Sequence, residues 1–201
     1  MMTVLLDNGH GGLINGLYQT KGKQVRWKDN EVFYEGEFNR AIVNGIMQEL
    51  TKLQIPYINL VPEHQDISLR TRVKRANNYA GIPCFYLSIH ANAGGGAGAE
   101  FFTSPGDTKS DAIASRFGEA FQQEFPNDRL RTDYSDGDLD KEARFYVLTK
   151  TKMPAVLTES FFMDNYTEYK NYLSTSAGRM RIVDYHVAAI QRINNELFKK
   201  R

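Results

Sequence analysis

Two apolar runs, each followed by a histidine, constrain the fold of this chain most. Residues 4–6 (Val-Leu-Leu) lead to His10 through a polar turn, and residues 84–89 (Cys-Phe-Tyr-Leu-Ser-Ile) lead directly to His90. Runs that are apolar on both faces are typical of buried strands in a largely parallel sheet. Ligands gather at the carboxyl ends of such strands, and only four histidines occur in the chain, so the sequence predicts that His10 and His90 share one site. Glycines flank His10 and let another group approach it closely.

The rest of the chain alternates predicted helices with predicted strands. Apolar spacing and end signals predict helices over 37–53, 68–79, 108–125 and 176–198, and strands over 57–61, 100–102 and 154–158. Residues 13–34 are expected to form an extended loop or β-ribbon beside the site. His186 lies on the apolar stripe of the last helix, which indicates a hydrogen-bonded core histidine. The pattern predicts an α/β fold, a single domain over 1–201 with a twisted, mostly parallel sheet and helices on both faces.

Composition excludes several classes of protein. The 201 residues suit one domain, and a net charge of +1 argues against electrostatically driven binding of nucleic acid. No stretch approaches the roughly 20 apolar residues of a membrane span. The first predicted strand begins almost at once, so we expect synthesis in the cytoplasm without a signal peptide.

Two imidazoles at one sheet edge favour zinc or another borderline transition metal, and hydrolytic zinc sites commonly add one carboxylate. Residue types and spacing leave Glu31, Glu35 and Glu37 open as the third ligand. Glu159 follows the apolar run 154–158 and precedes two phenylalanines. A carboxylate there is costly unless it is paired or functional, so Glu159 is either a general base beside the metal or a core residue paired with Arg or Lys.

Five motifs, in order along the chain, resemble the Amidase_3 family of zinc-dependent N-acetylmuramoyl-L-alanine amidases. They cover 7–12, 35–42, 69–72 with 76–77, 88–92 with 98–102, and 154–165. The resemblance implies His10, Glu35 and His90 as metal ligands and Glu159 as the catalytic carboxylate. Asn8 stands where the family usually has proline, and the segment 13–34 is a second departure, which we expect to shape a different substrate entrance.

The resemblance implies hydrolysis of the amide bond between N-acetylmuramic acid and L-alanine in peptidoglycan. A water activated by Zn²⁺ would be the nucleophile, and Glu159 the general base and then the general acid. Asn92 and Arg144 are further candidates for substrate contact, with hydrogen bonding to the imidazole and a surface ion pair as their respective alternatives. Action on the cell wall without a separate wall-binding domain favours a phage-type release. Two alternatives stay open, namely a zinc carboxypeptidase or other peptide amidase, and a non-catalytic peptidoglycan-binding module.

Overall fold

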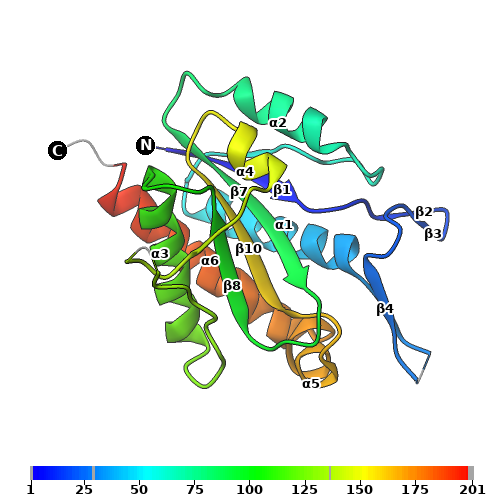
Figure 1. Cartoon of the computed structure of the whole chain (residues 1–201). Helices are drawn as coiled ribbons and strands as arrows, with labels where there is room; N and C mark the ends of the chain where they lie inside the picture. Colours follow the sequence, from blue (N-terminus) through cyan, green and yellow to red (C-terminus); the bar gives the residue numbers. More distant parts are fainter. Residues whose placement is uncertain (1, 29, 136, 199–201) are drawn as a thin grey trace.

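The computed structural model describes residues 2–28, 30–135 and 137–198. Within these residues a six-stranded sheet, in the order β6-β1-β7-β10-β8-β9, forms the centre of the molecule (Figure 1). Its strands are β1 (Thr3–Asn8), β6 (Tyr57–Asn59), β7 (Cys84–Asn92), β8 (Ala99–Thr103), β9 (Lys141–Glu142) and β10 (Ala155–Phe162). Strands β6, β1, β7 and β10 are parallel, whereas β8 runs antiparallel to β10. The mostly parallel sheet is therefore confirmed.

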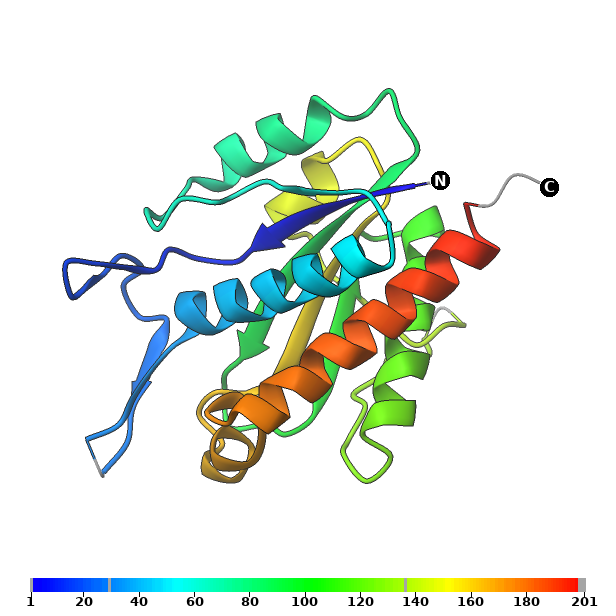
Figure 2. The same cartoon turned by 180° about the vertical axis from the view of Figure 1, so that it is seen from behind.

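Helices cover both faces of this sheet, as the sequence predicts. One face carries α1 (Glu35–Lys52), α3 (Lys109–Glu124) and α6 (Ser176–Glu196), which lie in front of the sheet in Figure 2. The other face carries the shorter α2 (Leu69–Asn77) and α4 (Tyr146–Lys150) (Figure 1). The short α5 (Tyr166–Glu168) continues into a π-helical turn, Tyr169–Leu173. The longer helices bury the larger of two hydrophobic clusters.

Alternation along the strands decides which side chains reach the more open face. Val4 packs in the larger cluster, and Leu5 in the smaller cluster beneath α2 and α4. Since successive side chains in a strand point to opposite faces, Asp7 lies on the same face as Leu5. In β7, Tyr86 packs in the smaller cluster, so Ser88 and His90 also project from that face.

Two differences from the expected boundaries change the position of candidate site residues. Helix α1 begins at Glu35 rather than at residue 37, which places Glu35 in its first turn. Strand β10 continues past Thr158 to Phe162, so Glu159 lies within the strand and not at its end. Polar side chains at 158–160 hide this continuation in the sequence, but backbone pairing with β7 and β8 sustains it.

The segment between β1 and α1 forms two small ribbons that project from the sheet (Figures 1 and 2). They are β2 (Leu13–Ile14) with β3 (Leu17–Tyr18), and β4 (Gln24–Arg26) with β5 (Val32–Tyr34). The predicted β-ribbon is thus confirmed.

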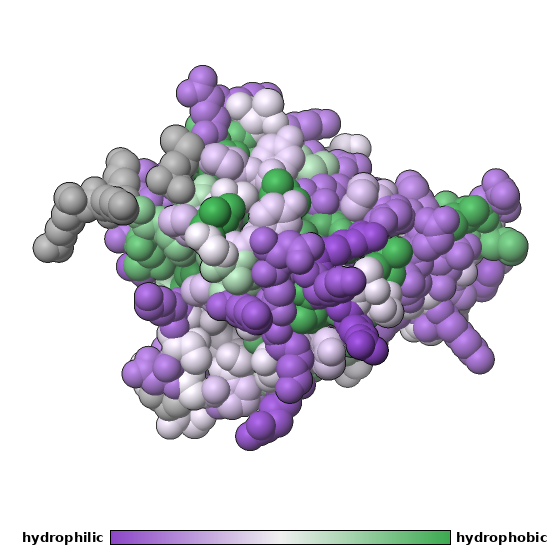
Figure 3. All heavy atoms as spheres, turned by 90° about the horizontal axis from the view of Figure 1, so that it is seen from above, coloured by the Kyte–Doolittle hydropathy of each residue, from purple (hydrophilic) through white to green (hydrophobic). Residues whose placement is uncertain are grey.

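The surface on the α2 side is mainly hydrophilic, with small hydrophobic patches between the polar side chains (Figure 3). In the parts of the chain that the structure describes, no helix has the length and apolar character needed to cross a membrane.

Candidate metal centre

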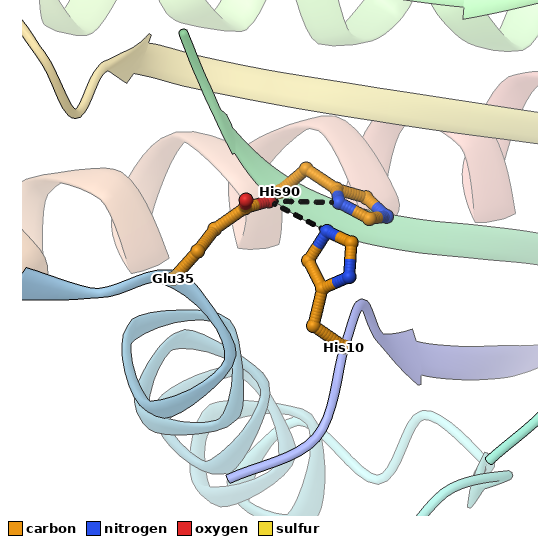
Figure 4. Close-up of side chains that lie close together, drawn as sticks. All are labelled: His10, Glu35 and His90. Atoms are coloured by element: carbon orange, nitrogen blue, oxygen red, sulfur yellow. Dashed lines mark hydrogen bonds and ion pairs between the residues drawn. The ribbon is translucent and has the colours of Figure 1, made fainter. Parts of the chain in front are cut away.

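Three side chains from distant parts of the sequence meet at the carboxyl edge of the sheet (Figure 4). His10 follows β1, His90 lies in β7, and Glu35 is the first residue of α1. Glu35 Oε1 lies 3.2 Å from His10 Nε2 and 3.0 Å from His90 Nδ1. The predicted meeting of His10 and His90 is confirmed, with a carboxylate between the two imidazoles.

Local backbone geometry makes this meeting possible. A Cβ atom at Gly9 would lie 2.0 Å from the nearest atom of the His90 ring, so only glycine fits at this position. His10 itself adopts a positive φ of 70°, which turns the chain sharply after β1. The group that approaches the chain closely beside His10 is therefore the imidazole ring of His90.

The donor set fits a divalent cation. Among the described residues, eight buried side-chain atoms have no hydrogen-bond partner, and three of them gather at this site, namely His10 Nε2, Glu35 Oε2 and Glu159 Oε2. Such orphaned atoms are rare because leaving them unpaired costs free energy. His10, Glu35 and His90 each offer a ligand atom, and these atoms lie within 4.8 Å of one another. Two imidazoles and one carboxylate suit zinc or a similar transition metal.

Burial and neighbouring charged groups shift the pKa values of Glu35, His90 and Glu159. Burial favours a raised pKa for Glu35, but the close contacts of this carboxylate with the imidazoles of His10 and His90 outweigh burial and lower the pKa of this carboxyl. Burial lowers the pKa of His90, against the opposing effect of Glu35. Burial, followed by the negative charge of Glu35, raises the pKa of Glu159 well above its ordinary value.

A cavity of about 240 Å³ opens beside the cluster, and Glu159 lines it together with His10 and His90. In the described part of the chain, Glu159 forms no ion pair, which removes the alternative of a core carboxylate paired with Arg or Lys. Lys23 also lines the cavity, and its Nζ lies 3.7 Å from Glu35 Oε2. Sequence reasoning missed Lys23, because nothing distinguishes it from the other lysines of the 13–34 segment.

The structure separates the three glutamates that spacing left open. Glu31 accepts a hydrogen bond from the Tyr169 hydroxyl, away from the cluster. Glu37 Oε1 accepts a hydrogen bond from the Leu13 amide and so ties α1 to the projecting segment. Of the three, only Glu35 contacts both histidines.

Neither of the two further candidates for substrate contact lines the cavity beside the cluster. Asn92 donates its side-chain amide to Glu100 Oε2, so its amide is engaged within the sheet. Arg144 is exposed and lines a different hollow, together with Ser104 and Thr108. Substrate contact by Asn92 or Arg144 stays a prediction.

Comparisons with known proteins agree with this geometry. The chain is 30% identical over 196 residues to the N-acetylmuramoyl-L-alanine amidase CwlM of Bacillus licheniformis, a match covering 97% of this chain and 70% of that protein. It is 28% identical over 200 residues to a sporulation-specific N-acetylmuramoyl-L-alanine amidase of Bacillus subtilis (strain 168), covering 97% of this chain and 69% of the relative.

Solved structures share the fold. The catalytic domain of CwlV, an N-acetylmuramoyl-L-alanine amidase from Bacillus (Paenibacillus) polymyxa var. colistinus, superimposes with a TM-score of 0.75 at 23% identity, covering 97% of this chain and 99% of that one. An N-acetylmuramoyl-L-alanine amidase from Clostridium difficile 630 gives a TM-score of 0.76 at 23% identity, covering 96% and 97%. The family model for N-acetylmuramoyl-L-alanine amidase matches residues 4–192, and the chain therefore belongs to the Amidase_3 family.

Proposed function

We propose that this protein hydrolyses the amide bond between N-acetylmuramic acid and L-alanine in peptidoglycan, with zinc held by His10, Glu35 and His90. The observation that carries the proposal is the convergence of these three side chains beside a cavity that Glu159 also lines. Family membership and the names of the relatives support the choice of bond.

The metal site and Glu159 have different roles in the proposed reaction. Zinc at this site supplies Lewis-acid activation of water and of the scissile carbonyl. Glu159 lines the cavity, and its Oε2 has no hydrogen-bond partner, so this oxygen is free to accept a proton from a water in the cavity. Glu159 takes a proton from the attacking water and then delivers it to the departing amine of L-alanine.

The rim of the cavity offers surfaces for a polymer of sugars and peptides. Leu69, Phe145 and Tyr146 line the cavity and are 53%, 42% and 40% exposed, respectively. Exposed apolar and aromatic surface beside polar catalytic groups is typical of substrate clefts. Lys23 places a positive charge at the same cavity, where it can attract the carboxylates of a stem peptide.

Mass spectrometry of digested peptidoglycan tests the proposed reaction. We expect the zinc-loaded protein to release intact stem peptides that begin with L-alanine and to leave free lactyl carboxyl groups on the glycan. A chelator should abolish this release, and added Zn²⁺ should restore it, because the ligand set needs a cation.

Other products would contradict the proposal. Cleavage within the stem peptide would indicate a carboxypeptidase or another peptidase. Binding to peptidoglycan without any release, in protein shown to contain zinc, would indicate a binding module.

A further inference from the structure

A chain of buried polar side chains lies behind His90, on the side of the ring away from Glu35. Ser88 lies two residues before His90 in β7, so both side chains project from the same face. Ser88 Oγ lies 3.1 Å from His90 Nε2 and donates a hydrogen bond to Asp7 Oδ2 at 3.3 Å. Asp7 comes from the neighbouring strand β1, where it pairs in register with Ser88.

Asp7 is itself held from two sides. The guanidinium of Arg72 donates to Asp7 Oδ1, and the hydroxyl of Tyr86 donates to Asp7 Oδ2. A second bond of the Arg72 guanidinium, 2.9 Å long, reaches the carbonyl oxygen of Asn8. Asp7, Arg72 and Tyr86 are each at most 2% exposed. Because a buried ion pair is weak evidence for a gain in stability, this arrangement calls for another explanation.

The direction of the hydrogen bonds supplies that explanation. An ionised carboxylate only accepts hydrogen bonds, so the single proton of the Ser88 hydroxyl goes to Asp7. The Ser88 oxygen is then left to accept a hydrogen bond from His90, which requires the proton of the neutral ring to be on Nε2. His90 Nδ1 therefore carries a lone pair, and it faces Glu35 Oε1 at 3.0 Å.

We propose that Asp7 and Ser88 are positioning residues that set the tautomer of His90, so that Nδ1 presents its lone pair to the metal. The proposal rests on the metal centre proposed above. A purely structural role would be satisfied by a hydrogen bond running in either direction. Metal binding accepts only one direction, because a protonated nitrogen cannot be a ligand.

Zinc affinity, measured by competition with a chromophoric chelator, tests the role of the Ser88 hydroxyl. We expect Ser88→Ala to weaken zinc binding by about 10- to 100-fold. Ser110→Ala is the matched control, because Ser110 is also buried and its Oγ accepts a hydrogen bond from the Ala155 amide at the amino end of β10. We expect this control to bind zinc within about twofold of the wild type, although it too loses a buried hydroxyl.

Equal zinc affinities for the two variants would overturn the positioning role and leave the metal centre standing. A wild-type protein that does not bind zinc would overturn both. Nuclear magnetic resonance of ¹⁵N-labelled imidazoles in the zinc-loaded wild type gives a second measurement that needs no variant. We expect the proton of His90 on Nε2, and a proton on Nδ1 would overturn the proposal.

Discussion

Two histidines with little exposed surface, His90 and His186, occupy different regions of the molecule, and each has a hydroxyl group as the partner of Nε2. His90 Nε2 lies 3.1 Å from the hydroxyl of Ser88 in its own strand, and His186 Nε2 lies 2.9 Å from the hydroxyl of Thr158 in β10. The two rings differ in the partner of the other nitrogen, Nδ1. His186 Nδ1 lies 2.8 Å from the carbonyl oxygen of Ile182, one turn earlier in α6, whereas His90 Nδ1 faces Glu35 at the cavity.

The difference shows what separates a structural histidine from a candidate ligand. His186 satisfies both ring nitrogens inside the core, which confirms the expectation of a hydrogen-bonded core histidine. His90 directs its second nitrogen toward a carboxylate and a second imidazole that belong to other elements. The side chain of His90 is 13% exposed and His186 is fully buried, and the partner of the second nitrogen is what separates their roles.

Replacing each histidine with glutamine should give the largest difference in effect between the two regions. His90→Gln removes a proposed metal ligand, so we expect amidase activity to fall to the level of the chelated wild type while the fold is retained. His186→Gln should bind zinc and keep its activity per folded molecule, but lose about 1–3 kcal/mol of unfolding free energy through its buried hydrogen bonds. Zinc content, activity and chemical denaturation, measured on both variants, check this. Zinc loss in His186→Gln would contradict the separation of the two regions.

Glu159→Gln should give the next largest effect, and it separates proton transfer from metal binding at the cavity. The change removes the proton acceptor but none of the proposed ligands, so we expect turnover to fall about 10²- to 10⁴-fold with zinc content unchanged. Peptide release from purified peptidoglycan and elemental analysis of the variant check the two parts. Release at the native rate would show that Glu159 is not the general base.

The core histidine should also make stability depend on pH. Burial lowers the pKa of His186 from 6.5 to about 3, with the hydrogen bond to Ile182 opposing the shift. A depressed pKa means that the neutral ring stabilises the fold above pH 6.5, and that this stability is lost as the pH falls toward 3. We expect the stability difference between wild type and His186→Gln to change by about 1.4 kcal/mol per pH unit over this range.

Denaturation of both proteins in metal-free form, at several pH values from 7 to 4.5, measures this difference. Removing the metal keeps protonation of the cavity histidines from adding a change in zinc binding. A difference that does not vary with pH would show that His186 is not buried in its neutral form.

The sequence predicted the carboxyl edge of the sheet correctly because strand periodicity and chain order are local properties. Two apolar runs ending at His10 and His90 were sufficient to predict a shared edge. Spacing could not choose among Glu31, Glu35 and Glu37, because the choice depends on how the projecting segment returns to the sheet. In the structure the Glu35 amide donates to the Lys23 carbonyl, and this bond anchors the start of α1 beside the histidines.

Local patterns of apolar and polar residues were sufficient to predict the α/β fold and the meeting of His10 with His90, and they singled out Glu159 as a candidate for the general base. The tertiary structure was needed to show which nitrogen of His90 faces Glu35, and that Lys23 reaches the cavity. It also brought Arg72 to Asp7, across 65 positions of sequence separation. These contacts depend on the orientation of side chains from separate elements, which packing determines and no local pattern encodes.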